Sequence, residues 1–331
     1  AGQRVVGIDA GVVGGGAAGR TGGFLLAGLA AFYHDAVAAH GRERARAIYR
    51  HTLEGLDRME RETPDVMRRV GSLRIAMTRE EVEDCRRQLD AMRADGLPAE
   101  WYEGPEGVGL RIPGDGVFQP LARCRILARR AVEAGARLFE HSPAVEVTGT
   151  EVRTPAGRVR CERVVVAVDG WLERLLPELE GRVRTVRLQM LATAPTDEVR
   201  FPLPVYARYG YEYWQQLPDG RIVLGGFRDR GGEGEWGAAP VPAEPVQGAL
   251  EAFLREELGV DAPITHRWAA SVGYTPDGLP ILEEVRDGVW VAGGYNGTGN
   301  VVGMLSGRAA ARLALGRPSA FARALRDSTV H

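Results

Sequence analysis

Two glycine-rich segments hold the residues with the clearest chemical potential in this chain of 331 residues. The first spans residues 4–28 and joins a short apolar run, residues 5–8, to Asp9 and then to a series of glycines. The second spans residues 293–300. Glycine lets main-chain N–H groups approach a ligand closely, and a carboxylate at a strand end meets the nucleotide ribose in doubly wound sheets. The pattern indicates a dinucleotide site.

The first segment has two interpretations. In one, residues 9–14 are a degraded G-x-G-x-x-G motif, but the glycines that follow would break the helix that such a motif opens. In the other, residues 5–9 form the second strand of the nucleotide fold, because the motif precedes its ribose carboxylate by about 20 residues. We favour the second interpretation, in which the first strand lies upstream of Ala1 and the chain is truncated or incomplete.

The second segment lies between a predicted strand and a predicted helix. Residues 289–292 are apolar and read as a strand, and residues 301–315 form an amphipathic helix ended by Gly316 and Pro318. A helix N-terminus carries a partial positive charge. We therefore expect this loop to face an anionic group.

Other elements follow from periodicity and capping residues. A helical pattern covers residues 29–67 with a break at Gly41, and residues 71–77 alternate as a strand. Thr78 and Glu81 form a capping box for a helix that reaches Ala94. Further elements are a helix over residues 119–134, a strand region over 137–147, a hairpin over 152–159, a strand over 164–168 buried on both faces, and a helix over 246–258.

Residues 183–227 are rich in β-branched and aromatic residues and predict an antiparallel sheet with strands over 186–193, 205–209, 211–216 and 222–226. The predicted fold class is α/β, a Rossmann-like nucleotide-binding domain with an inserted antiparallel substrate domain of α+β type. We assign residues 1–68, 105–184 and 266–331 to the first domain. Residues 69–104 and 185–265 form the second.

Composition excludes several classes of function. A net charge of −2 and a pI near 6.4 give no electrostatic case for nucleic acid, and no run of about 18 apolar residues predicts a membrane span. We therefore expect a cytoplasmic protein. The chain has no lysine, which rules out a Schiff base and a Walker-type phosphate loop. Cys85, Cys124 and Cys161 are too widely spaced for a zinc site, and no metal is expected. The oligomeric state stays open.

Four segments, taken together, resemble the D-amino-acid oxidase superfamily of FAD-dependent oxidoreductases, in the branch with glycine oxidase, sarcosine oxidase and γ-glutamylputrescine oxidase. They are residues 9–24, 115–121, 163–171 with the V-V-V-A run, and 274–308 with T-P-D-G-L-P and G-Y-N-G-T-G-N. The chain differs from the family in having no G-x-G-x-x-G motif after a first strand, upstream of the ribose carboxylate. It also has no lysine of the kind that sarcosine oxidase-like members place beside the flavin.

The resemblance implies FAD as the cofactor. It places Asp9 at the adenosine ribose and the main chain of Ala144 and Val145 at the adenine. Along the pyrophosphate and ribityl chain it places Gly16, Ala17, Gly19 and Arg20, and beside the isoalloxazine Thr21, Gly22 and Gly23. At the N1–C2=O2 edge of the ring it places Gly294, Asn296, Gly297, Thr298, Gly299 and Asn300.

The resemblance also implies a reaction, the oxidation of an amine or amino acid by hydride transfer to flavin N5. The product is an imine, with hydrogen peroxide where oxygen is the acceptor. Candidates for the substrate pocket are Tyr211, Tyr213, Trp268, Tyr274 and Tyr295, because aromatic faces suit an amine cation or its apolar stem. Arg228 is the candidate for a substrate carboxylate; the alternative is an exposed loop arginine.

Two other functions stay open. One is a glycine, sarcosine or D-amino-acid oxidase proper, with Arg228 as the carboxylate clamp. The other is a non-catalytic or flavin-free relative whose sheet is completed by another chain. For the amine or amino-acid oxidoreductase, and for the oxidase proper, the binding partner is a small-molecule amine or amino acid.

Overall fold

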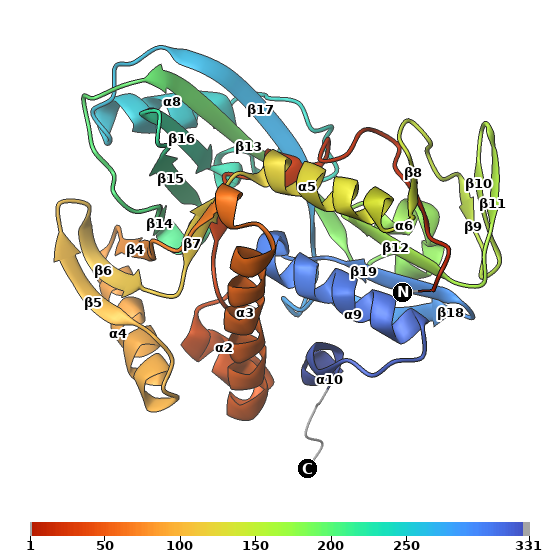
Figure 1. Cartoon of the computed structure of the whole chain (residues 1–331). Coiled ribbons are helices and arrows are strands. Elements are labelled where there is room, and N and C mark those ends of the chain that lie inside the picture. The colour runs from red at the N-terminus through yellow and green to blue at the C-terminus, as the bar shows by residue number, and fades with distance from the viewer. Residues whose placement is uncertain (1, 327–331) are drawn as a thin grey trace.

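The computed structural model describes residues 2–326, and its largest element is an eight-stranded sheet (Figure 1). In spatial order the strands are β17 (Ile264–Tyr274), β13 (Arg184–Pro195), β16 (Arg221–Gly226), β15 (Glu212–Gln216), β14 (Val205–Ala207), β4 (Ser72–Ala76), β6 (Gly107–Ile112) and β5 (Glu100–Gly104). All neighbours are antiparallel except β14 and β4, which are parallel. The sheet is thus predominantly antiparallel, as the sequence predicts.

Local sequence explains how several of these strands begin and end. The predicted turn at residues 218–220 joins β15 to β16, with the Leu217 N–H donating to the Arg221 carbonyl over 2.8 Å. The strand predicted over residues 205–209 is shorter than expected. Arg208 and Tyr209 have φ values of 45° and 54°, and this left-handed conformation cannot continue an extended strand. The helix α8 (Val246–Glu256) packs on β13 and β16, ending two residues earlier than predicted.

The nucleotide-side strands form smaller sheets. β1 (Val6–Ile8) pairs in parallel with β8 (Arg137–Phe139), and β12 (Val164–Asp169) pairs in parallel with β19 (Val289–Gly293), which pairs with β18 (Ile281–Arg286). A third small sheet contains β9 (Glu146–Val147), β10 (Glu151–Thr154) and β11 (Gly157–Arg160), the last two forming the predicted hairpin. Within residues 2–326, β1 and β12 each pair with one neighbour.

The prediction that residues 164–168 are buried on both faces is wrong. Val164 and Val166 are buried, but Val165 is 39% and Val168 47% exposed. Val164 and Val166 pack on the core, whereas Val165 and Val168 stay exposed and the outer edge of β12 pairs with no described strand. The β-branched run therefore reflects a parallel strand with a single covered face.

The helices largely follow the predicted capping residues. The predicted capping box is present at α4 (Arg79–Ala94): the Glu81 N–H donates to Thr78 Oγ1 over 3.2 Å, and Glu81 Oε2 accepts from the Met77 N–H. Gly41, at φ 82°, separates α2 (Tyr33–His40) from α3 (Arg42–Glu62). Residues 29–32 precede the helix, contrary to the predicted start. The remaining helices are α1 (Ala17–Arg20), α5 (Pro120–Glu133), α6 (Leu172–Leu175), α7 (Arg228–Gly231), α9 (Met304–Ala314) and α10 (Ala320–Arg326).

Short strands and one helical irregularity complete the arrangement. β2 (Phe24–Leu25), β7 (Gly116–Phe118) and β3 (Met67–Arg68) form a three-stranded sheet. The predicted helix from residue 301 begins instead as a π-helical turn, Gly299–Gly303, before α9. None of the helices within residues 2–326 has the length and apolar character that a membrane crossing requires.

The fold is mixed α/β, as predicted. The division into two domains stays a prediction, and the sheet membership of two strands bears on its boundaries. β6 and β17 belong to the eight-stranded sheet, although the predicted boundaries at residues 105 and 266 place most of each strand with the nucleotide-binding domain.

Candidate active site

A single cavity of about 1380 Å³ brings the two glycine-rich segments together with the aromatic strands. Ordinary small-molecule sites measure about 300–1,000 Å³, so this volume is sufficient for a dinucleotide and a small substrate together. Residues from β1, α1, β12, β17, α7 and the loop between β19 and α9 all line it. We call residues 9–24 and 294–300 the glycine wall.

The first half of the glycine wall is organised by Asp9, which directly follows β1. Its Oδ1 accepts from the Gly11 N–H over 2.7 Å, and its carbonyl accepts from the Ser142 N–H over 2.7 Å. A side chain at Gly16 would meet no atom within 4 Å, so the main chain there stands open. Of the predicted residues in this half and its neighbourhood, Asp9, Gly16, Ala17, Arg20, Thr21, Gly22 and Ala144 line the cavity.

Three predicted residues of this group do not line the cavity, namely Gly19, Gly23 and Val145. Both glycines are needed for packing instead. A Cβ at Gly19 would lie 2.1 Å from the Gly14 carbonyl oxygen, and one at Gly23 would lie 2.4 Å from the Phe118 carbonyl oxygen. Gly23 also has φ 76°, which favours glycine. Val145 is exposed outside the cavity wall.

The second half of the glycine wall is the loop between β19 and α9. Asn296, Gly297, Thr298, Gly299 and Asn300 line the cavity, whereas Gly294 packs against Thr275 behind it. The amide of Asn300 donates to Thr21 Oγ1 over 3.1 Å and to the Phe24 carbonyl over 2.7 Å. These bonds join the two glycine-rich segments, which are far apart in sequence.

The residues of the glycine wall fit a dinucleotide such as FAD. Asp9 supplies a carboxylate, Thr21, Thr298 and Asn300 supply hydroxyl and amide groups, and the open main chain at Gly16 supplies a surface for close approach. Backbone N–H groups with small side chains are the usual donors to phosphates and flat rings. The roles of individual residues toward FAD stay predictions.

All five predicted aromatic residues also line the cavity, namely Tyr211, Tyr213, Trp268, Tyr274 and Tyr295. Trp268 Nε1 donates to the Arg20 carbonyl over 2.8 Å, which fixes the indole against the glycine wall. Tyr295 donates its hydroxyl to the Ala292 carbonyl over 2.9 Å. Burial raises the pKa of Tyr274 to about 12 and that of Tyr213 and Tyr295 further, so all three phenols stay protonated at neutral pH.

Arg228 begins α7, directly after β16 and Phe227, and its half-buried side chain lines the cavity. Its guanidinium carbon lies 4.7 Å from the ring centre of Tyr211, 5.1 Å from that of Tyr274 and 5.9 Å from that of Trp236. Its Nη2 donates to the Tyr211 hydroxyl over 3.3 Å.

Within residues 2–326 no carboxylate forms an ion pair with Arg228. The side chain is therefore a cation held among aromatic rings at the edge of the cavity, and the alternative of an exposed loop arginine does not describe it.

Sequence reasoning missed three residues of the site. Tyr206 on β14 lines the cavity and stacks on Tyr213 at a ring distance of 6.3 Å, and Trp236 covers Arg228. Asp169, at the end of β12, also lines the cavity. Tyr206 and Trp236 had no spacing signal, but an Asp-Gly pair after a β-branched run marks a strand end that carries a carboxylate. We call Tyr206, Tyr211, Tyr213, Trp268 and Tyr274, with Arg228, the aromatic wall.

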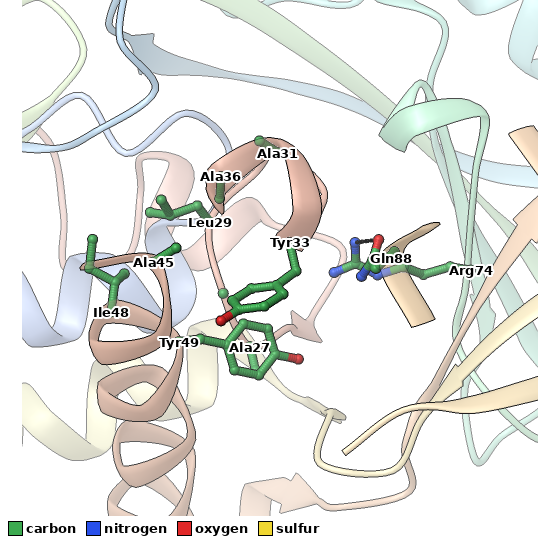
Figure 2. A pocket seen from close by; sticks show the side chains of 11 residues that line it. Ala27, Leu29, Ala31, Tyr33, Ala36, Ala45, Ile48, Tyr49, Arg74 and Gln88 are labelled. Carbon is green, nitrogen blue, oxygen red and sulfur yellow. Dashed lines mark hydrogen bonds between the residues drawn. The ribbon is translucent and has the colours of Figure 1, made fainter. Parts of the chain in front are cut away.

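A second, much smaller cavity lies behind residues 27–31, between α2, α3 and β4 (Figure 2). Its volume of about 10 Å³ holds at most one water molecule. Arg74 Nε and the Tyr49 hydroxyl are buried beside it without a hydrogen-bond partner among the described residues, and Arg74 donates to Gln88 Oε1. The cavity is therefore too small for a substrate.

Fold and cavity together define an α/β protein with a dinucleotide-sized site beside an aromatic chamber. The sequence profile of the family described as FAD dependent oxidoreductase (DAO) matches residues 1–313. The chain belongs to this family, and FAD is its cofactor.

Relatives of known sequence agree with this assignment. The chain is 28% identical to a probable oxidoreductase OrdL of Rhizobium meliloti (strain 1021), over 96% of this chain and 78% of the relative. It is 28% identical to sarcosine oxidase subunit beta of Arthrobacter sp, over 69% of this chain and 63% of the relative. It is 26% identical to glycine oxidase of Geobacillus kaustophilus (strain HTA426), over 76% of this chain and 71% of the relative.

Solved structures show the same fold. Glycine oxidase from Geobacillus kaustophilus superposes with a TM-score of 0.77 at 23% identity, covering 99% of this chain and 92% of that one. L-proline dehydrogenase from P. horikoshii gives a TM-score of 0.75 at 18% identity, covering 94% of this chain and 87% of that one.

Proposed function

We propose that the protein oxidises an amino acid, a substrate that carries both an amine and a carboxylate, to the corresponding imine. The observation that carries this proposal is Arg228, a cation on the cavity wall without an ion-pair partner among the described residues. A guanidinium forms its strongest hydrogen bonds with a carboxylate. The relatives named glycine oxidase and sarcosine oxidase subunit beta support the same substrate class.

In this proposal the glycine wall holds FAD and the aromatic wall holds the substrate. Asp9 binds the adenosine ribose, and the main chain near Ala144 borders the adenine. Residues 16–20 follow the pyrophosphate and ribityl chain, while Thr21, Gly22 and residues 296–300 border the ring. When bound, FAD supplies the electron acceptor for the hydride of the substrate C–H bond.

The chain's own contribution is orientation and exclusion of water. Arg228 fixes the carboxylate end of the substrate, and the rings of Tyr211, Tyr213 and Tyr274 surround the amine and its stem. The phenols of Tyr213 and Tyr274 are protonated at neutral pH and serve as hydrogen-bond donors, so neither acts as a base. A neutral amine needs no side-chain base, because the electron pair on nitrogen drives the loss of hydride.

Hydrolysis of the imine follows in water and releases the amine nitrogen. Where oxygen reoxidises the flavin, the second product is hydrogen peroxide. The chain contains no lysine that could assist the reaction with oxygen, so we propose a dye or a protein electron carrier as an equally suitable acceptor. Comparing turnover with oxygen and with an artificial dye distinguishes an oxidase from a dehydrogenase.

Arg228→Met and Arg230→Met test the proposal as a matched pair, since Arg230 is exposed on the same helix. Hydrogen bonds to charged groups contribute about 1.5–3 kcal/mol, so Arg228→Met raises KM for glycine or sarcosine about 10–100-fold. FAD affinity stays unchanged in both variants, and Arg230→Met behaves as the wild type.

A substrate panel decides between the proposed function and the alternatives. Turnover of glycine or sarcosine supports an amino-acid substrate, whereas turnover of putrescine-type amines alone contradicts it and favours an amine oxidase. A purified protein that is colourless and gains no flavin absorbance with added FAD favours a non-catalytic relative.

A further inference from the structure

Asp169 occupies a junction of three segments that the mechanism above does not use. It ends β12, and its two carboxylate oxygens bind two different segments. Oδ1 accepts from the Tyr295 N–H over 2.9 Å, in the loop between β19 and α9, and Oδ2 accepts from the Gly273 N–H over 3.1 Å, on β17. The Asp169 carbonyl accepts from the Gly294 N–H over 3.2 Å.

Glycines next to Asp169 allow the neighbouring main chains to approach it closely. A Cβ at Gly273 would lie 2.7 Å from the Asp169 carbonyl oxygen, and one at Gly293 would lie 2.9 Å from the same atom. Both distances are shorter than side chains tolerate, so only glycine fits at these two positions. The three segments therefore meet in direct backbone contact.

Asp169 itself has φ 61°, in the left-handed region. A non-glycine residue there costs on the order of 1 kcal/mol or more, and such residues are maintained where surrounding contacts require them. A glycine would adopt this conformation without strain. The carboxylate is thus the reason for a strained residue at this position.

The carboxylate has no cationic partner among the described residues. The titratable groups that face it are the phenols of Tyr274 on β17 and Tyr295 on the loop, and its hydrogen bonds come from main-chain N–H groups. Burial raises the pKa of Asp169 to about 6, opposed by those hydrogen bonds. The group is half-buried because one side borders the cavity, and it is ionised at neutral pH.

We propose that Asp169 is a positioning residue that holds the cofactor-facing loop, residues 294–300, against β17 and so fixes the two walls of the cavity relative to each other. β17 carries Trp268 and Tyr274 of the aromatic wall, and the loop carries Thr298 and Asn300 of the glycine wall. The role toward FAD rests on the proposed function; the role within the protein does not.

Asparagine at position 169 is an informative replacement, because both hydrogen bonds to the carboxylate come from main-chain N–H groups. In Asp169→Asn, the new side chain would present one oxygen and one NH₂ group to two main-chain N–H groups, and neither N–H can become an acceptor. One of them loses its partner, which weakens the closed loop. Asp115 is the matched control: it is buried, burial raises its pKa to about 6 as at Asp169, and it accepts from the Ala27 N–H and the Ser72 hydroxyl. Asp115 does not line the cavity.

Hydrogen exchange on the protein without FAD tests the proposal first. In Asp169→Asn, amides of residues 293–300 exchange about 10–100-fold faster than in the wild type after correction for intrinsic rates, because a lost hydrogen bond to a charged group corresponds to about that range. In the wild type the protection of the same amides rises as the pH falls from about 6 to about 4, because the carboxyl of the closed loop has the higher pKa and binds its proton more tightly than the open loop does. Asp115→Asn retains the wild-type protection and its pH dependence. Equal exchange of this loop in Asp169→Asn and the wild type overturns the proposal.

The visible spectrum of bound FAD tests the cofactor part. In the wild type and Asp115→Asn the flavin absorbance bands shift as the pH crosses about 6, whereas in Asp169→Asn the shift is absent. A shift that persists in Asp169→Asn overturns the link to the cofactor. Failure of the wild type to bind FAD contradicts the proposed function, while the exchange measurement still decides the role of Asp169.

Discussion

The two walls of the cavity are built in different ways. Four residues of the aromatic wall lie on one continuous eight-stranded sheet with α8 packed on it, and Tyr211 and Arg228 lie beside its strand ends. The glycine wall is instead made of loops that follow short strands in separate small sheets (Figure 1). The first is stabilised by ladder hydrogen bonds and buried apolar side chains. The second is stabilised by single polar contacts, such as those of Asp169 and Asn300. Substitutions of the same kind should therefore have different effects on the two sides.

The largest expected difference is in stability. Val205 on β14 is fully buried, and Val165 on β12 is 39% exposed. Val205→Ala lowers the free energy of unfolding by about 2–3 kcal/mol, through lost burial and the resulting cavity, whereas Val165→Ala lowers it by less than about 1 kcal/mol. Urea denaturation of the two variants measures the contrast. Equal losses would show that β12 is packed as tightly as the large sheet.

The carboxyl groups of Asp115 and Asp169 make the stability of the protein depend on pH. Burial raises the pKa of both Asp115 and Asp169 to about 6 from an ordinary value of 3.8. The folded protein thus binds these protons more tightly than the unfolded chain does. Its free energy of unfolding falls as the pH rises from about 4 to about 6, and the contribution of each proton is lost above that range.

Replacing either aspartate with asparagine removes that residue's contribution to the pH dependence of the free energy of unfolding. Asp115→Asn keeps both hydrogen bonds, because the Ser72 hydroxyl is free to rotate and accept from the new amide. Its stability at pH 7 therefore matches or exceeds that of the wild type. Asp169→Asn leaves one main-chain N–H without a partner and loses about 1–3 kcal/mol. Thermal denaturation between pH 4 and pH 8 distinguishes them; an unchanged slope in both variants contradicts the assignment.

A smaller effect is expected where the two glycine-rich segments join. Asn300→Ala removes the bonds to Thr21 and to the Phe24 carbonyl. We expect FAD affinity to fall about 10-fold, consistent with about 1–1.5 kcal/mol for lost neutral hydrogen bonds, with little change in the stability of the eight-stranded sheet. Quenching of flavin fluorescence measures the affinity. Unchanged affinity would mean that this junction does not shape the cofactor site.

The smallest effect is expected at the surface. Glu146 and Arg153 form an exposed ion pair between β9 and β10, outside both walls. Glu146→Gln changes the free energy of unfolding by less than about 0.5 kcal/mol, because water and salt screen such pairs. A loss above about 1 kcal/mol in urea denaturation would show that the small sheets depend on surface charge.

Much of the local structure was predictable because its signals are local. Thr78 with Glu81, Gly41 and the turn at residues 218–220 each act within a few residues, and each appears where the sequence places it. The fold class and the family followed from motifs in a fixed order. Gly19 and Gly23 do not line the cavity and are closely packed, and a sequence does not distinguish a glycine needed for close packing from one needed for ligand approach.

The features that sequence reasoning missed depend on long-range pairing. The parallel pairing of β14 with β4 places Val205 beside Leu73, more than 100 residues away in sequence, and β6 and β5 extend the large sheet beyond β4. That pairing brings Tyr206 into the aromatic wall. The burial of β12 was overestimated, because a β-branched run does not show how many neighbours a strand has.

The most direct test of the account is a crystal structure of the protein with FAD. We predict the adenosine ribose at Asp9, with the isoalloxazine between Thr21 and residues 298–300 and facing the aromatic wall. A structure with Asp9 beside the pyrophosphate, or with the ring on the far side of the cavity from Arg228, would contradict the account.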